Sequence, residues 1–140
     1  MSFVLQLPAK IRAELEAQAS AGYPDETCGV LLGRAEGERC TVLADYPARN
    51  LNHERSRDRF ELDPHDYLAA EDAASVAGTA VLGIWHSHPD HPARPSETDR
   101  EMAWPGWSYV ILSVGAGGVV DLRSWRITGE EFCEEEVRHV

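Results

Sequence analysis

The chain has 140 residues, which fits one domain with a substantial core, and its 43% hydrophobic and 26% charged content is ordinary for a globular protein. A formal net charge of −11 argues against a nucleic-acid or anionic membrane surface, because binding polyphosphate requires Lys and Arg to displace counterions. Three Cys without a Cys-x-x-Cys pair, no long apolar run and no secretory leader pattern predict a cytoplasmic protein in a reducing compartment. We therefore expect a single domain over residues 1–140.

The first third of the chain carries one helical and two strand patterns. Apolar residues recur every four positions from Leu7 to Ala19, which predicts an amphipathic helix over 8–21. A short apolar run between glycines predicts a buried strand over 26–33. A β-branched segment over 40–46 is its expected hairpin partner.

The middle of the chain leads into a central strand. Residues 49–59 are polar and lack periodicity, which is typical of an exposed loop, and a short strand is expected over 60–62. An acid followed by Pro predicts the start of a second helix over 64–77. A nearly continuous apolar run over 79–85 predicts a strand covered on both faces.

The last third combines a short helix with a hairpin. Ser96 is placed to cap a helix that Pro105 and Gly106 stop. Strands are expected over 108–114 and 119–126, and the acidic tail is expected to add an edge strand. Hairpins and helices in this order predict an α+β fold, in which helices flank a mixed sheet.

Two histidines follow the central apolar run at a spacing suited to a metal. Residues two apart on a strand face the same side, so His86 and His88 can both bind one ion. Asp99, in the first turn of the helix after the Pro-rich loop, is the candidate third ligand. Two His and one carboxylate leave a fourth tetrahedral position for water, which is the pattern of a catalytic zinc site.

The remaining roles of an amide hydrolase also have candidates. Glu26, before the first buried strand, could take a proton from the zinc-bound water and return it to the leaving amine. Ser96 could donate a hydrogen bond to the developing oxyanion.

Each candidate also has a plainer interpretation. A His-x-His pair arises readily by chance in a chain with six His, and Ser96 and Asp99 also form a capping arrangement. Glu26 alone would be an ordinary solvated carboxylate. Only the fixed offsets from the His pair to Ser and Asp make the pattern specific.

The complete pattern resembles the JAMM, or MPN-plus, metalloproteases, whose signature is an early Glu and His-x-His followed by seven residues, Ser, two residues and Asp. Here His88 is followed by seven residues, Ser96, two residues and Asp99. The segments 24–33 and 59–64 are similar to segments of the stand-alone prokaryotic branch of that family.

The resemblance covers roughly residues 8 to 126. It implies the MPN/JAB fold, with a cytidine-deaminase-like architecture and a curved, mostly antiparallel sheet carrying zinc at one edge. It also implies one Zn²⁺ per chain on His86, His88 and Asp99, with Glu26 as base and Ser96 as oxyanion donor. The expected reaction is hydrolysis of the amide bond after the C-terminal Gly-Gly of a ubiquitin-like sulfur-carrier protein, releasing cysteine or trailing residues.

Several alternatives stay open at this point. The chain could remove ubiquitin-like modifiers from proteins generally, or it could be a non-catalytic MPN scaffold. Two His and a carboxylate also form the facial triad of non-haem iron oxygenases. A cysteine hydrolase using Cys28 is a further alternative, although a thiol in a buried strand is usually inert. A homodimer is also open, whereas a nucleic-acid or membrane partner is not expected.

Overall fold

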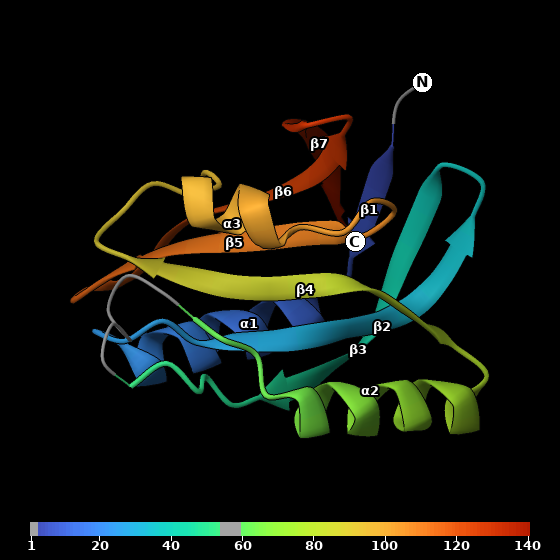
Figure 1. Cartoon of the computed structure of the whole chain (residues 1–140), viewed down its shortest axis with the longest axis horizontal. Helices are drawn as coiled ribbons and strands as arrows, with labels where there is room; N and C mark the ends of the chain where they lie inside the picture. The colour runs from blue at the N-terminus through green and yellow to red at the C-terminus, as the bar shows by residue number, and fades with distance from the viewer. Residues whose placement is uncertain (1–2, 54–59) are drawn as a thin grey trace.

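Seven strands form one sheet in the part of the chain that the structure, a computed structural model, describes, namely residues 3–53 and 60–140. Their order is β1-β3-β2-β4-β5-β6-β7, and β7 pairs back with β1 to close a barrel (Figure 1). The strands are β1 (Val4–Leu7), β2 (Cys28–Glu36), β3 (Arg39–Ala48), β4 (Ala80–Pro89), β5 (Ser108–Gly115), β6 (Gly118–Thr128) and β7 (Glu131–His139).

The sheet is mixed. β1 runs parallel to both β3 and β7, and β4 runs parallel to β5, whereas the other neighbouring strands are antiparallel. The helices are α1 (Ala9–Gly22), α2 (Pro64–Ala77) and α3 (Glu97–Met102). This arrangement confirms the predicted α+β class with a mostly antiparallel sheet. Among the described residues, no helix has the length and apolar character that crossing a membrane requires.

Local sequence signals explain where α2 begins and ends. The Asp63 carboxylate accepts a hydrogen bond of 2.8 Å from the His65 N–H, and Pro64 occupies the first turn, where its missing N–H costs nothing. Gly78 ends the helix in the left-handed conformation, with φ of 71°.

Two apolar clusters lie on opposite faces of the central strands. Leu31 and Trp85 belong to the cluster that includes the buried side of α1, whereas Val30 and Ile84 pack with α2. In Figure 1, α1 lies behind the sheet and α2 runs along its lower side. Because residues two apart on a strand share a face, His86 extends the Ile84 face of β4, the one that α2 covers.

The sequence predictions differ from the structure at several element boundaries. β4 continues to Pro89, so both histidines lie within the strand and not beyond its end. The strand expected over 60–62 is only an isolated bridge between Asn50 and Leu62. β1 was not predicted, since no element was expected before residue 8. Of the predicted loop over 49–59, residues 54–59 lie outside the described part of the chain.

The acidic C-terminal segment differs from its prediction in the number of strands that flank it. It does form a strand, but β7 is not an edge, because it pairs with β6 on one side and with β1 on the other. Its pairing with a strand from the opposite terminus has no local signal in the sequence.

Candidate metal centre

Strand β4 brings the two histidines together on one face. His86 and His88 are 1% and 8% exposed, and their Nε2 atoms lie 3.1 Å apart. The strand is held between β2 and β5, with His86 paired to Cys28 on one side and to Ile111 on the other. This two-sided pairing fixes the backbone that carries both rings.

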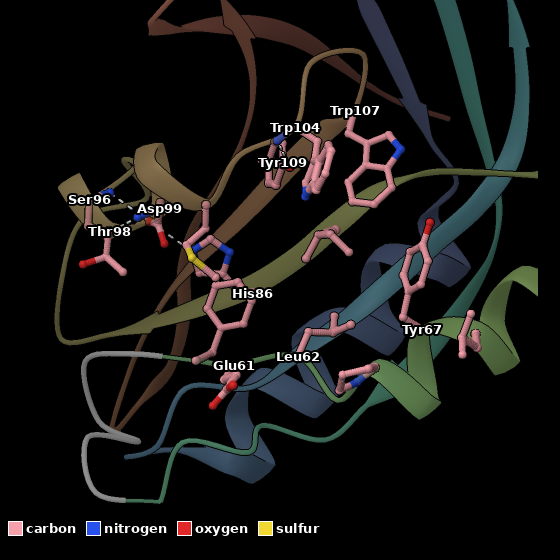
Figure 2. A pocket seen from close by; sticks show the side chains of 15 residues that line it. Glu61, Leu62, Tyr67, His86, Ser96, Thr98, Asp99, Trp104, Trp107 and Tyr109 are labelled. Carbon is pink, nitrogen blue, oxygen red and sulfur yellow. Dashed lines mark hydrogen bonds and ion pairs between the residues drawn. The ribbon is translucent and has the colours of Figure 1, made fainter.

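The start of α3 brings Asp99 to the same point. Ser96 and Asp99 form a capping box: the Ser96 Oγ accepts from the Asp99 N–H at 3.0 Å, and the Asp99 Oδ2 accepts from the Ser96 N–H at 2.8 Å. The same Oδ2 lies 3.3 Å from His86 Nε2 and 3.2 Å from His88 Nε2. Figure 2 shows the Asp99 side chain directed at His86.

These three atoms have the spacing of metal ligands. Their separations are 3.1, 3.2 and 3.3 Å, and ligands about 2.0 Å from a tetrahedral zinc ion lie about 3.3 Å from each other. The His88 Nδ1 lies 2.9 Å from the carbonyl oxygen of Pro92, which can only accept. Nδ1 therefore carries the proton and leaves the Nε2 lone pair free for an ion. The donor set fits zinc.

Glu26 is the second carboxylate near the histidines. It is only 5% exposed, and one of its oxygens lies within 4.8 Å of a ring nitrogen of each histidine. Its backbone oxygen accepts from the Asn50 Nδ2 at 3.1 Å, and the N–H of the next residue, Thr27, donates to the Ser87 Oγ at 2.9 Å. Contacts to two other segments thus hold Glu26 beside the His pair.

Burial and charge act differently on the pKa values of the three candidate ligands, His86, His88 and Asp99. Burial lowers the pKa of His86 and outweighs the charge of Asp99. Burial also opposes ionisation of His88, but the hydrogen bonds and charge of its partners, Asp99 foremost, raise its pKa overall. Burial pushes the Asp99 pKa upward, yet the two imidazoles and the Ser96 N–H hold it far below its usual range. Asp99 is therefore an anion facing His88, as a metal ligand must be.

Ser96 forms the cap predicted from the sequence, and its geometry leaves the other predicted role open. Its oxygen caps α3, which is the structural role. Its hydroxyl proton is not used by the cap, and the residue is exposed at the mouth of the site. The capping geometry is therefore compatible with donation to a substrate oxygen.

Two contacts at the site were not predicted. The Phe60 ring stacks on His86, with centroids 4.5 Å apart and an interplanar angle of 26°. The Asn50 Oδ1 accepts from the N–H of Glu61 at 2.9 Å, so Asn50 joins the backbone of Glu26 to the segment that carries Phe60. The only sequence signal was the resemblance of residues 59–64 to a family segment, which named no contact.

Cys28 lies beside the site but is buried. Burial, with a smaller effect from the charges of Glu26 and Asp66, raises the pKa of its thiol to about 12. A thiol of this kind is protonated at neutral pH and is a poor nucleophile. The geometry therefore gives no support to a cysteine hydrolase.

A cavity of about 720 Å³ opens beside His86. Residues 60–62, the first turns of α2, the middle of β4, α3 and residues 104–109 line it. Figure 2 shows His86 and Asp99 at one end and Tyr67 with Trp107 at the other. A ligand that reaches His86 thus also meets an apolar wall.

Known proteins resemble this chain over nearly its full length. The family described as prokaryotic homologs of the JAB domain (Prok-JAB) matches residues 8–128. A desampylase of Haloferax volcanii is 38% identical over 138 residues, covering 95% of this chain and 94% of the relative. A CysO-cysteine peptidase of Mycobacterium tuberculosis is 35% identical over 142 aligned positions, covering 99% and 92%.

A solved structure also resembles this chain over nearly its full length. The solution structure of protein DSY2949 from Desulfitobacterium hafniense superposes with a TM-score of 0.86 at 36% sequence identity. The match covers 97% of this chain and 92% of that one.

Proposed function

Because the chain belongs to the prokaryotic homologues of the JAB domain, a JAMM-type family, we propose that it is a zinc hydrolase acting on a ubiquitin-like sulfur carrier. It cleaves the amide bond after the C-terminal Gly-Gly of the carrier and releases cysteine or trailing residues. The observation that carries the proposal is the triangle of His86, His88 and Asp99 with Glu26 beside it. A CysO-cysteine peptidase among the relatives supports this substrate class.

Each residue of the site has a definite part in this reaction. His86, His88 and Asp99 would hold one Zn²⁺ per chain, which supplies Lewis acidity and a water of lowered pKa. Glu26 takes the proton of the attacking water and returns it to the leaving amine, a role that suits a buried carboxylate at the edge of the triangle. Ser96 donates a hydrogen bond from its hydroxyl to the substrate oxygen as negative charge develops there.

The desampylase relative favours a second substrate for the same chemistry, namely a protein conjugate of a ubiquitin-like modifier. Both substrates present the same flexible Gly-Gly tail to the site. They differ only in the group that leaves.

Mass spectrometry of a ubiquitin-like carrier, before and after incubation with the zinc-loaded protein, tests the proposal. We expect the carrier to lose the mass of cysteine, a short peptide or a protein, less the one water that hydrolysis adds, and this loss identifies the leaving group. Chelation should abolish the reaction and added zinc should restore it.

A matched pair of variants isolates the base. Glu26→Gln should lower kcat by roughly 100- to 10,000-fold and still bind one equivalent of zinc. Glu36→Gln, which changes an exposed carboxylate at the far end of β2, the strand that follows Glu26, should leave kcat unchanged. Full activity in Glu26→Gln would contradict the mechanism. Failure to bind zinc near one equivalent, measured by elemental analysis, would favour the scaffold, and bound iron would favour the oxygenase.

A further inference from the structure

The cavity beside the candidate metal centre has two chemically different ends. His86, Ser96 and Asp99 stand at the polar end, where the amide bond would react. The other end is aromatic: the ring centroids of Tyr67 and Trp107 are 5.7 Å apart, and those of Trp107 and Tyr109 are 6.4 Å apart. Figure 2 shows Tyr67 and Trp107 on the side of the cavity away from Asp99. One molecule that fills the cavity must therefore be polar at one end and apolar at the other.

The aromatic end is held in place by the protein itself. The Tyr109 hydroxyl accepts a hydrogen bond of 2.6 Å from the Trp104 N–H, which fixes the segment between α3 and β5. Tyr109 also packs edge-on against Phe132 of β7, with centroids 5.6 Å apart. Because these side chains are already ordered, a ligand that binds to them loses less conformational entropy than it would at a mobile surface.

Large apolar side chains stand exposed around the opening. Leu68 of α2 is 56% exposed, and Met102 of α3 and Trp104 are each 65% exposed. All three line the cavity. Apolar surface gathered around a concave site marks a place where a ligand covers it.

For a carrier that releases cysteine, only one part of the proposed substrate suits the apolar end. The leaving cysteine is small and carries charged groups. The two glycines that precede the scissile bond have no side chains. The residues on the N-terminal side of the Gly-Gly are the remaining candidates, because an extended tail carries them away from the reacting carbonyl by about 3.3 Å per residue.

We propose that the aromatic end of this cavity is a specificity site for a bulky apolar side chain of the carrier tail, at one of the two positions before the Gly-Gly. The proposal rests on the proposed function for the location of the scissile bond. Carriers with such a residue are substrates of this chain, and carriers with only small polar residues there are poor ones. Burying one Leu or Phe side chain corresponds to roughly 10- to 100-fold in affinity.

Paired tail peptides test this specificity. One peptide ends in Leu-Leu-Gly-Gly-Cys and the other in Ser-Ser-Gly-Gly-Cys, and kcat/KM is measured for each with the zinc-loaded protein. The apolar tail should be cleaved with a kcat/KM at least about tenfold higher. A third peptide, with Ser-Ser before the Gly-Gly and Leu in place of Cys after it, should gain nothing over the polar tail.

Two variants on α2, one at the cavity opening and one away from it, provide a test and its matched control. Leu68→Glu places a charge at the opening and should lower kcat/KM for the apolar tail about tenfold, with little effect on the polar tail. Val76→Glu makes the same change on α2 at a site that is 91% exposed and outside the cavity, and it should alter neither. Both positions are exposed, so both variants should fold, which thermal unfolding verifies.

A binding measurement separates this inference from the proposed function. Calorimetry with the product peptides, which end in a free Gly-Gly, requires no turnover. Tighter binding of the Leu-Leu product without any cleavage would support the specificity site and count against the hydrolase. Cleavage of both tails at equal kcat/KM would overturn the site and leave the hydrolase standing. A preference set by the residue after the scissile bond would also overturn the site.

Discussion

Ser96 caps α3 and is also the proposed oxyanion donor, and a substitution can separate these two roles. Its oxygen caps α3 while its hydroxyl proton is available to a substrate. Glycine is tolerated at a helix N-cap at a cost of only a few tenths of a kcal/mol, because it leaves the backbone N–H groups open to water. Loss of an oxyanion donor, in contrast, lowers kcat by roughly 100- to 1000-fold.

We therefore expect Ser96→Gly to lose most of its kcat while its unfolding temperature changes little. Steady-state kinetics and calorimetric unfolding on the same preparation check both effects. Ser96→Thr keeps the hydroxyl and the cap and should retain most of the activity. A variant that unfolds earlier but turns over normally would show that Ser96 is a cap alone.

The three cysteines should differ sharply in reactivity. The Cys28 thiol has its pKa raised to about 12, chiefly by burial, so the reactive thiolate is scarce at any pH below that value. Cys40 is also buried, whereas Cys133 is exposed. Iodoacetamide at pH 8 should add one group to the native chain and three to the chain unfolded in urea, as counted by mass spectrometry. Modification of Cys28 in the native state, with loss of activity, would restore the cysteine hydrolase as an alternative.

The sequence could predict that the three ligand candidates lie close together, because their geometry is local. His86 and His88 share a strand face, and Ser96 fixes Asp99 through a cap within one helical turn. The contacts of Phe60 and Asn50 were not predictable, because they join segments that only the folded chain brings together. The roles of the ligand candidates stay predictions until zinc and turnover are measured.

At the scale of elements, β4 depends on a very close approach to β5. A Cβ built on Gly83 would lie 1.8 Å from the backbone oxygen of Ser108, and backbone atoms cannot move aside as the end of a side chain can. Gly83→Ala should therefore lower the free energy of unfolding by about 3 kcal/mol or more, because it forces β4 away from its neighbour. Zinc affinity should fall with it, since both histidines lie on β4.

Gly117→Ala is the control for this prediction. A Cβ at Gly117 meets no atom within 4 Å, so this variant should unfold at nearly the same urea concentration as the wild type. Urea titrations followed by circular dichroism compare the two. Equal unfolding midpoints would show that the strand pair tolerates a wider spacing than the structure has.

Element types were easier to predict than element ends. The periodicity of α1 and α2 and the apolar run of β4 are properties of the local sequence. The end of β4 is not, because pairing with β2 and β5 extends the strand through its polar histidines to Pro89. Pairing also decides that residues 60–62 form one bridge and no strand.

At the scale of the whole molecule, the two ends of the chain close the barrel. β7 pairs with β1 in parallel, and such a pairing between residues more than a hundred positions apart leaves no local signal. The mixed sheet was predicted, but its closure was not. Closure buries the network around Glu135, whose side chain accepts from the Ser124 Oγ at 2.6 Å and from the Arg126 Nε at 2.7 Å.

This network should contribute strongly to stability. Arg126 and Glu135 are only 9% and 6% exposed, and the guanidinium also lies over the Phe3 ring at 4.3 Å. Removing one partner of a buried pair leaves the other charge uncompensated, which typically costs about 3 to 5 kcal/mol. We expect Glu135→Ala to lower the free energy of unfolding by about this amount, as measured by urea titration.

Glu134→Ala removes the neighbouring carboxylate, whose partner Arg123 has a side chain 42% exposed to solvent. Exposed ion pairs are screened by water and contribute little, so the unfolding midpoint should barely change. If the two variants were equally stable, the Arg126 network would not secure the closure. A different outcome is that Glu135→Ala stays folded at low temperature but no longer binds zinc. This result would show that barrel closure also fixes the position of β4, to which β5 and β6 connect it through the sheet.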